Sequence, residues 1–196
     1  MPRSAALQDL LDAAATACRE VARGDSARVT ETVFARATRD GTQPHRVPPI
    51  GLPACDWLAP ALAAAARGPH GGVARAFATL APQLAWTRRA GTTPNGGAFW
   101  DGHANAVLCG PAGYEPRDDI LIGATIMAPG VQYPEHDHPP EEVYLPLSQG
   151  EWWNSARGWM DPQGLSLICN PPGIRHSMRA PAAAPLLALW FLPLGG

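Results

Sequence analysis

The hydrophobic pattern of the first 82 residues is helical. Apolar side chains recur at intervals of three or four residues, the spacing that places them on one face of a helix. Gly24 is expected to end the first helix, because glycine commonly follows a helix C-terminus. The apolar residues of this helix are Leu7, Leu10, Leu11, Ala14 and Cys18.

Further segments of this first part have a pattern or a boundary signal. Residues 29–37 fit a helix or a strand. The proline-rich residues 45–53 exclude a helix, since proline lacks the amide hydrogen that a helix interior needs. Residues 57–67 predict a helix that is capped by Asp56 and ended by a Gly-Pro pair. Residues 73–80 predict a short third helix.

From residue 83 onward the pattern changes to short apolar runs separated by Gly, Pro, Asn and Asp. Such turn residues recur roughly every eight to twelve positions, which is typical of a β-sandwich or barrel. We therefore expect a mainly β protein, in which an α-helical N-terminal segment, residues 1–82, packs on a β-barrel, residues 83–196, as one structural unit. The predicted strands are residues 84–88, 106–109, 120–127, 143–147, 165–169 and 186–192.

The composition excludes several functional classes. Hydrophobic residues make up 46% and charged residues 16% of the 196 residues, which is enough apolar area for a packed core. The net charge of −2 indicates no nucleic-acid partner and no anionic membrane surface. All 15 basic residues are arginine. The absence of lysine excludes an internal Schiff base and a phosphate-loop NTPase.

The cysteines and the N-terminus indicate a cytoplasmic protein. Cys18, Cys55, Cys109 and Cys169 form no CxxC pair, and a chain of this length does not need disulfides. Acidic residues interrupt the N-terminal apolar stretches, so no signal peptide is expected. The most apolar run, residues 182–194, is shorter than the roughly 20 residues that span a bilayer and reads as a last core strand.

Histidine and glutamate residues with metal-ligand spacing occur in two motifs of the second part. The first is His136-Asp-His138, followed after three residues by Glu142, and the second is PPGIRH, which ends at His176. Residues two apart on a strand point to the same side, so His136 and His138 are expected to face one way. Imidazole and carboxylate ligands suit a divalent Zn, Fe, Mn, Co or Ni ion. His45 and His70 are expected in solvated loops, and His103 stays undecided.

These two motifs resemble the conserved motifs of the cupin superfamily, in which a glycine precedes HxH and a glutamate by fixed spacings and PxGxxH follows. Gly130 stands at the first position. The sequence departs from the pattern at Gln149, where glycine is usual, and at Ala180, where asparagine usually closes the second motif. Neither departure affects a ligand. The resemblance implies a cupin fold, the double-stranded β-helix or jelly-roll barrel.

Two tyrosines narrow the resemblance. The string Tyr-x-x-His-x-His-x-x-x-Glu-x-Tyr, from Tyr133 to Tyr144, lies before a distal histidine and after an alanine-rich helical region. It is similar to the cupin-type dimethylsulfoniopropionate (DMSP) lyases of the DddL and DddQ kinds over about residues 130–180. This resemblance implies Tyr144 as a phenol at the metal and Tyr133 as a base. The implied metal ligands are His138, Glu142 and His176, with His136 added because it is a ligand in most cupins.

The resemblance also implies a metal-dependent carbon–sulfur lyase that forms dimethyl sulfide and acrylate by β-elimination. The difficult step is removal of a proton next to a carboxylate, and a phenol whose pKa a metal lowers from about 10 suits that task. Tyr133 and Tyr144 are therefore the predicted catalytic residues. Aromatic faces attract a sulfonium cation, which makes Trp153 and Trp190 candidate substrate-binding residues. At most one of Trp152 and Trp153 lines the interior, because neighbours on a strand face opposite sides.

Two other functions stay open at this point. One is another metallo-cupin enzyme, an Fe-dependent dioxygenase or an isomerase, and the dioxygenase would consume O2. The other is a non-catalytic cupin that binds a small molecule. The expected partner is a small sulfonium carboxylate, with no nucleic acid and no membrane, and a homodimer is one assembly that barrel edges allow.

Overall fold

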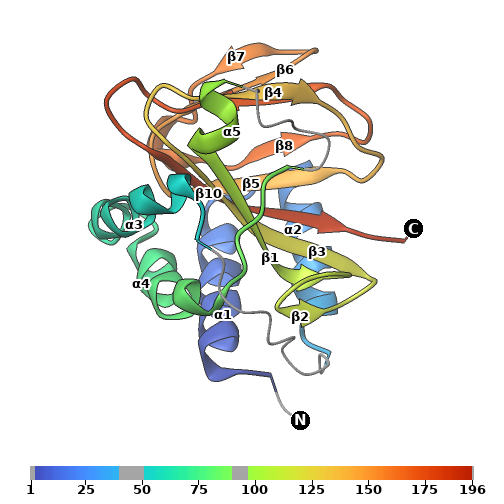
Figure 1. Cartoon of the computed structure of the whole chain (residues 1–196). Coiled ribbons are helices and arrows are strands. Elements are labelled where there is room, and N and C mark those ends of the chain that lie inside the picture. Colours follow the sequence, from blue (N-terminus) through green and yellow to red (C-terminus); the bar gives the residue numbers. More distant parts are fainter. Residues whose placement is uncertain (1–2, 40–50, 90–96, 196) are drawn as a thin grey trace.

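The computed structural model describes residues 3–39, 51–89 and 97–195 and consists of helices packed against two stacked sheets (Figure 1). The chain starts with helices and ends with strands, in the order that the hydrophobic pattern predicts. Short 3-10 turns occur at Pro53–Trp57, Ala81–Gln83 and Gln163–Leu165. The helices are α1 (Ala5–Val21), α2 (Asp25–Ala37), α3 (Leu58–Ala65), α4 (Gly71–Leu80) and α5 (Ala98–Gly102).

The large sheet has six strands in the order β2-β1-β3-β10-β5-β8, and the small sheet has four in the order β4-β9-β6-β7. All pairings between named strands are antiparallel except β1 with β2. The large-sheet strands are β1 (His103–Gly110), β2 (Glu115–Pro116), β3 (Ile120–Met127), β5 (Glu142–Pro146), β8 (Ile168–Asn170) and β10 (Leu186–Pro193). The small-sheet strands are β4 (Gln132–His136), β6 (Glu151–Asn154), β7 (Gly158–Met160) and β9 (His176–Arg179).

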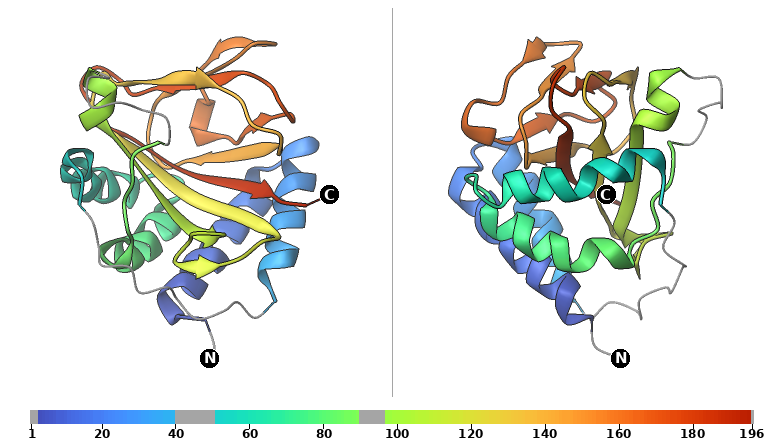
Figure 2. Two further views of the ribbon diagram at one scale, coloured as in Figure 1. Left: turned by 45° about the vertical axis from the view of Figure 1, so that its right-hand side comes forward. Right: turned by 60° about the vertical axis from the view of Figure 1, so that its left-hand side comes forward.

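Helices α1 to α4 cover the face of the large sheet that points away from the small sheet, whereas α5 lies near the small sheet (Figure 2). One apolar cluster lies between these helices and that outer face. It contains Leu7 and Phe77 from the helices and Leu189 and Phe191 from β10. A second cluster lies between the two sheets and includes aromatic residues from both. This second, interior cluster is the part of the fold that borders the predicted site.

The predicted helices are confirmed with corrections at their ends. The first helix buries its five predicted apolar residues, and residues 29–37, which fitted helix or strand, lie in α2. Gly24 does not end α1; with φ of +56° it stands at the N-cap of α2. Asp56 does not cap α3, because the 3-10 turn that begins at Pro53 leads directly into the helix and Trp57 occupies the cap position.

The predicted strands are confirmed where they are long and apolar. Residues 120–127 are β3, residues 143–147 and 186–192 match most of β5 and β10, and residues 106–109 match half of β1. Residues 84–88 are not a strand: they make a single bridge, between Thr87 and Asn105. Of the predicted strand 165–169, only residues 168 and 169 lie in a strand, β8. The 3-10 turn Gln163–Leu165 occupies the start of the predicted segment.

Several smaller predictions also have an outcome. His70 is buried rather than solvated, since its Nε2 lies 3.0 Å from the Leu165 carbonyl oxygen in a hydrogen bond. His45 lies outside the described residues. The four cysteines are free thiols, as expected. No helix in the described ranges is long and apolar enough to cross a membrane. The boundary at residue 82 stays a prediction.

Candidate metal centre

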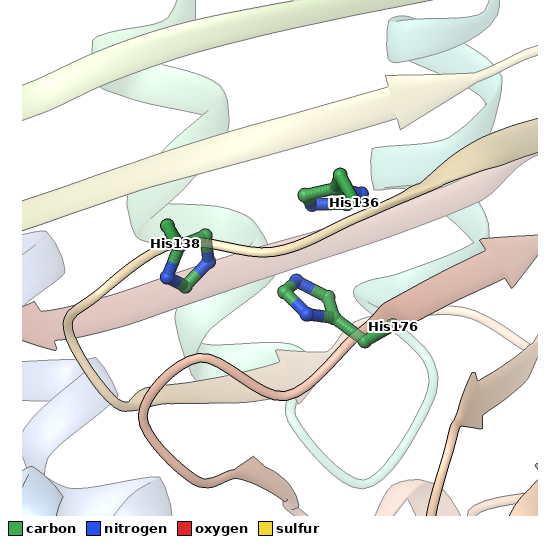
Figure 3. Close-up of side chains that lie close together, drawn as sticks. All are labelled: His136, His138 and His176. Carbon is green, nitrogen blue, oxygen red and sulfur yellow. The ribbon is translucent and has the colours of Figure 1, made fainter.

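Three histidines from two neighbouring strands face one another inside the barrel (Figure 3). His136 ends β4 and is the cross-strand partner of His176, which begins β9. His138 lies just beyond β4. One ring nitrogen from each histidine is within 4.8 Å of the other two. The sequence prediction that His136 and His138 face the same way therefore holds, although the strand ends before His138.

A backbone carbonyl holds each of the three imidazoles through its Nδ1 atom. An Nδ1–H that donates to a carbonyl leaves the lone pair of Nε2 available, which is the usual arrangement around histidine metal ligands. All three acceptors lie two residues away in sequence, so the loops themselves orient the rings. The acceptor oxygens are those of Pro134 at 2.9 Å for His136, Pro140 at 2.8 Å for His138 and Ile174 at 2.9 Å for His176.

Glu142 approaches the histidines from the large sheet, at the start of β5. Its Oε2 lies 3.3 Å from Nε2 of His138 and 3.1 Å from Nε2 of His176. Burial works to raise the pKa of this carboxyl, but the two imidazoles outweigh it and hold the pKa at about 2. Glu142 is therefore an ionised carboxylate at neutral pH, deep in the protein.

The donor set fits a divalent metal ion. Nε2 of His176 is buried and lies 3.1 Å from the Glu142 carboxylate without a well-formed hydrogen bond to it, an arrangement that costs free energy unless the nitrogen also binds something else. Burial and the neighbouring His176 lower the pKa of His136 to about 4, so its ring is neutral, as a ligand must be. Three imidazole nitrogens and one carboxylate suit first-row metals such as zinc and iron.

Both predicted catalytic tyrosines lie beside this cluster and are buried. The Tyr133 ring, on β4, is 5.0 Å from the His136 ring, and its hydroxyl oxygen accepts a 3.0 Å hydrogen bond from Asn105. The Tyr144 ring, on β5, is 6.4 Å from the His176 ring. Burial raises the pKa of both phenols, and for Tyr144 the Glu142 carboxylate raises it further.

The structure brings one of the two predicted tryptophans to this region. Trp190 on β10 pairs directly with Tyr144 on the same side of the sheet. Trp153 pairs with Ser177, one residue from His176, and therefore points to the opposite face. Its neighbour Trp152 is buried inside the barrel, with its ring 6.3 Å from that of Tyr144. The strand alternation predicts that at most one of Trp152 and Trp153 faces the interior, and in the structure that residue is Trp152.

Sequence reasoning missed two polar residues that border Tyr133. Asn105 lies on β1 and bonds to the phenol oxygen. The guanidinium carbon of Arg89 is 5.7 Å from the Tyr133 ring centroid, and its charge lowers the pKa of His136 and opposes the rise for Tyr133. The backbone N–H of Arg89 donates to the buried His103 at 2.9 Å. Neither residue belongs to a motif, so only spatial proximity reveals them.

Known proteins resemble this chain in sequence and in structure. A protein of Cereibacter sphaeroides assigned as dimethylsulfoniopropionate lyase DddL is 30% identical over 141 residues, which is 71% of this chain and 59% of that protein. The chain thus spans less than two thirds of the length of this relative. A family model described as dimethylsulfoniopropionate lyase matches residues 25–188.

Two crystal structures share the fold along nearly the whole chain. DMSP lyase DddQ from Ruegeria pomeroyi aligns with a TM-score of 0.70 and 21% identity, over 97% of this chain and 92% of that one. A chain from the structures of the DMSP lyases RdDddP and RnDddQII aligns equally well, with 22% identity over 98% and 94% of the two chains. Together, the cupin-type barrel, the ligand motifs and the family match establish that the chain belongs to the DMSP lyase family.

Proposed function

We propose that this protein is a metal-dependent lyase that cleaves DMSP into dimethyl sulfide and acrylate. The observation that carries the proposal is the cluster of three histidines and Glu142 with two buried tyrosines against it. Membership of the DMSP lyase family supports the substrate. The same cluster in an unrelated cupin would support a metal site but would leave the substrate open.

The metal site of this proposal consists of His136, His138, His176 and Glu142. Polarisation of the substrate carboxylate, which stabilises the negative charge that develops as the neighbouring proton leaves, is the chemistry that a bound divalent ion supplies. Outside these four residues, three backbone carbonyls hydrogen-bond to the imidazole rings and orient them. Such orienting contacts matter for affinity, since their loss commonly weakens metal binding about 10- to 100-fold.

Tyr133 is the proposed base. The phenol oxygen, in its deprotonated form, takes the proton from the carbon next to the substrate carboxylate. The electron pair of that C–H bond forms the double bond of acrylate, and the C–S bond breaks with its pair leaving on dimethyl sulfide. A sulfonium is a good leaving group, so no general acid is needed.

The surroundings of the two tyrosines favour this assignment over the reverse. The oxygen of Tyr133 accepts a hydrogen bond from Asn105 and lies near the positive charge of Arg89, and both interactions favour a phenolate. Tyr144 lies beside the ionised Glu142, which disfavours a phenolate. We therefore propose that the Tyr144 phenol contacts the metal ion and the substrate and does not act as the base.

The two charges of DMSP match two kinds of side chain in the same region. The guanidinium of Arg89 attracts the carboxylate end, because arginine binds carboxylates through its paired N–H groups. The indole ring of Trp152 lies 6.3 Å from that of Tyr144, and Trp190 is the strand partner of Tyr144, with its indole over Gly123. Both tryptophans offer aromatic faces to the sulfonium. Trp153 has no role in this proposal, because it points out of the barrel.

The test measures both products. The purified protein is stripped of metal, reloaded separately with Zn, Fe(II), Mn, Co or Ni, and incubated with DMSP in sealed vials. We expect dimethyl sulfide in the headspace and an equal amount of acrylate in solution, and loss of both with a chelator. No product with any of the metals would overturn the proposal. Oxygen consumption in the Fe(II) sample would then point to a dioxygenase.

A further inference from the structure

A chain of side-chain hydrogen bonds leads across the barrel interior to the oxygen of Tyr133. It starts at Trp190 on β10, passes through Thr125 on β3 and Asn105 on β1, and ends at Tyr133 on β4. The donor–acceptor distances are 3.1 Å, 2.6 Å and 3.0 Å in that order. This hydrogen-bond chain joins the central strands of the large sheet to the small sheet, and neither of the two histidine motifs in this sequence includes Asn105 or Thr125.

The hydrogen bonds all run in one direction, from Trp190 toward Tyr133. An indole N–H only donates, so the Thr125 hydroxyl accepts from Trp190. The hydroxyl proton of Thr125 then goes to the carbonyl oxygen of Asn105, and 2.6 Å is a normal length for an O–H···O bond. The amide oxygen of Asn105 is thereby taken, and its NH2 group faces Tyr133. The phenol oxygen consequently receives a hydrogen bond.

The packing around Trp190 keeps this first donor in place. Trp190 lies across Gly123 of the neighbouring strand β3. A Cβ atom at position 123 would lie 2.1 Å from the indole ring, so only glycine leaves room for it there. Thr125, which accepts the indole hydrogen bond, is 2% exposed. Water therefore does not compete for the middle of the chain.

We propose that Asn105 is a positioning residue for the elimination, and that Thr125 and Trp190 act through it by orienting its amide. This inference rests on the proposed function, in which Tyr133 takes the substrate proton. A donor at position 105 holds the phenol oxygen at one place, beside the charge of Arg89, and keeps the oxygen able to accept a proton from the substrate. An acceptor there would instead bind the tyrosine proton and turn the oxygen away from the substrate. Correct placement of a reacting atom is worth large factors in rate.

The decisive variant is Asn105→Asp, which keeps the shape of the side chain and removes the donor. The carboxylate still accepts from Thr125, but it accepts from Tyr133 instead of donating to it. We expect kcat to fall about 10- to 100-fold and KM to stay within about twofold, because the change acts on the reacting group and not on substrate affinity. Metal content and melting temperature are measured on the same sample.

A second readout does not depend on activity. The chain has three tyrosines, so labelling with 13C at the phenol carbon gives three resolvable NMR signals, and Tyr133→Phe identifies the signal of Tyr133. In Asn105→Asp we expect that signal to shift. The signal of Tyr114, whose hydroxyl donates to Gln83 at 2.9 Å, is the internal control and should not move.

Thr125→Val provides an independent variant if Asn105→Asp folds poorly. It removes the hydroxyl that orients the amide while leaving Asn105 in place, and we expect a smaller loss of kcat, about 3- to 10-fold, and a shift of the same NMR signal. Thr30→Val is the matched control: Thr30 is equally buried, but it lies in α2. It should leave both kcat and the Tyr133 signal unchanged.

The outcomes separate this inference from the proposed function. A fall in kcat at constant KM, with a shift of the Tyr133 signal alone, supports the positioning role. An unmoved Tyr133 signal, unchanged kcat in both variants, or a loss of kcat that only parallels lost metal or stability overturns it. If the wild-type protein forms no dimethyl sulfide, the proposed function fails, and the NMR experiment still decides whether Asn105 donates to Tyr133.

Discussion

The two faces of the large sheet come from the same strands and differ completely in chemistry. On β10, Leu187, Leu189 and Phe191 point to the helices, and Leu186, Ala188 and Trp190 point to the barrel interior. The helix-facing cluster is apolar throughout. The interior face carries Thr125, Glu142 and Tyr144 among its apolar residues, all of them buried.

The difference shows how one sheet serves both stability and chemistry. The helix-facing side buries apolar area and needs no partners for polar groups, so it contributes mainly to the free energy of folding. On the interior side each buried polar group costs free energy unless it has a partner. Hydrogen bonds supply most of those partners; the buried nitrogens without one are Trp152 Nε1 and His176 Nε2, and the latter lies among the proposed metal ligands. Substitutions on the two faces should therefore have separable effects.

The largest effect is expected at a proposed metal ligand, His176, which reaches the barrel interior from the small sheet. His176→Ala should abolish metal binding and lower activity by more than about 1000-fold, because its nitrogen and the partner contact with Glu142 are lost together. Metal content by elemental analysis and product formation measure the change. His70→Asn, a buried histidine outside the cluster, is the control and should keep its metal. Full metal content and activity in His176→Ala would refute the ligand assignment.

Removal of a single phenol oxygen atom from the barrel interior should have the next largest effect. Tyr133→Phe should lower kcat about 100- to 10,000-fold, the range for loss of a general base, at unchanged metal content. Tyr144→Phe should cost less, since that phenol is assigned to the metal and the substrate. Steady-state kinetics measure kcat for both variants and for a control, Tyr114→Phe, because the hydroxyl of Tyr114 faces Gln83 outside the site. Equal losses of kcat in all three variants would contradict the separate roles assigned to Tyr133 and Tyr144.

A helix-facing substitution should affect stability and spare the chemistry. Leu189→Ala should lower the free energy of unfolding by about 2–5 kcal/mol, because it removes buried methyl groups and leaves a cavity. Urea denaturation measures this change, and kcat at low temperature should stay within about twofold of wild type. Leu189→Met keeps the volume and should cost under about 1.5 kcal/mol. A large loss of kcat in folded Leu189→Ala would show that the two faces are coupled.

The positive charge of Arg89, beside the barrel interior, should increase the affinity for the substrate. Arg89→Gln should raise KM for DMSP about tenfold, or about 1.4 kcal/mol, if its guanidinium attracts the substrate carboxylate. Arg88→Gln is the matched control, because Arg88 binds Asp101 and the Trp100 carbonyl instead. An unchanged KM in Arg89→Gln, or an equal rise in the control, would contradict this role.

The smallest effect concerns the pH dependence of stability. Burial lowers the pKa of His103 below its usual value, so between the two pKa values the unfolded chain binds a proton that the folded protein does not. Stability is then complete above about pH 6.5 and falls as the pH drops below it. Metal-free wild type should melt at a lower temperature at pH 5.5 than at pH 7.5.

The variant His103→Gln should show a smaller decrease over the same interval. The change that remains in this variant combines two opposite contributions: the pKa of His136 is lowered to about 4, and Glu142, against burial, raises the pKa of His138. Between pH 7.5 and 8.5 neither His103 nor His136 titrates, and melting temperatures there serve as the baseline. An identical decrease in wild type and His103→Gln would show that His103 does not contribute.

Sequence reasoning succeeded where a feature depends on neighbouring residues. The period of Leu7, Leu10 and Leu11 predicts the buried face of α1, and the apolar run 120–127 predicts β3. The ligand motifs are also local, since each has its own spacing and turn. The barrel then brings His176 beside His136 through the pairing of β9 with β4. The division at residue 82, the homodimer and the cytoplasmic location stay predictions.

Local pattern by itself determined helices α1, α3 and α4, the long apolar strands and the residues able to bind a metal, but it left α2 open and did not predict α5. The tertiary structure alone decided that Trp152 rather than Trp153 lies inside, that His70 is buried, and that Asn105 meets Tyr133. The physical reason is distance along the chain. Asn105 and Tyr133 are 28 residues apart, and Trp190 and Thr125 are 65 apart. Strand register sets such contacts, and no local periodicity encodes which residues of two distant strands will meet.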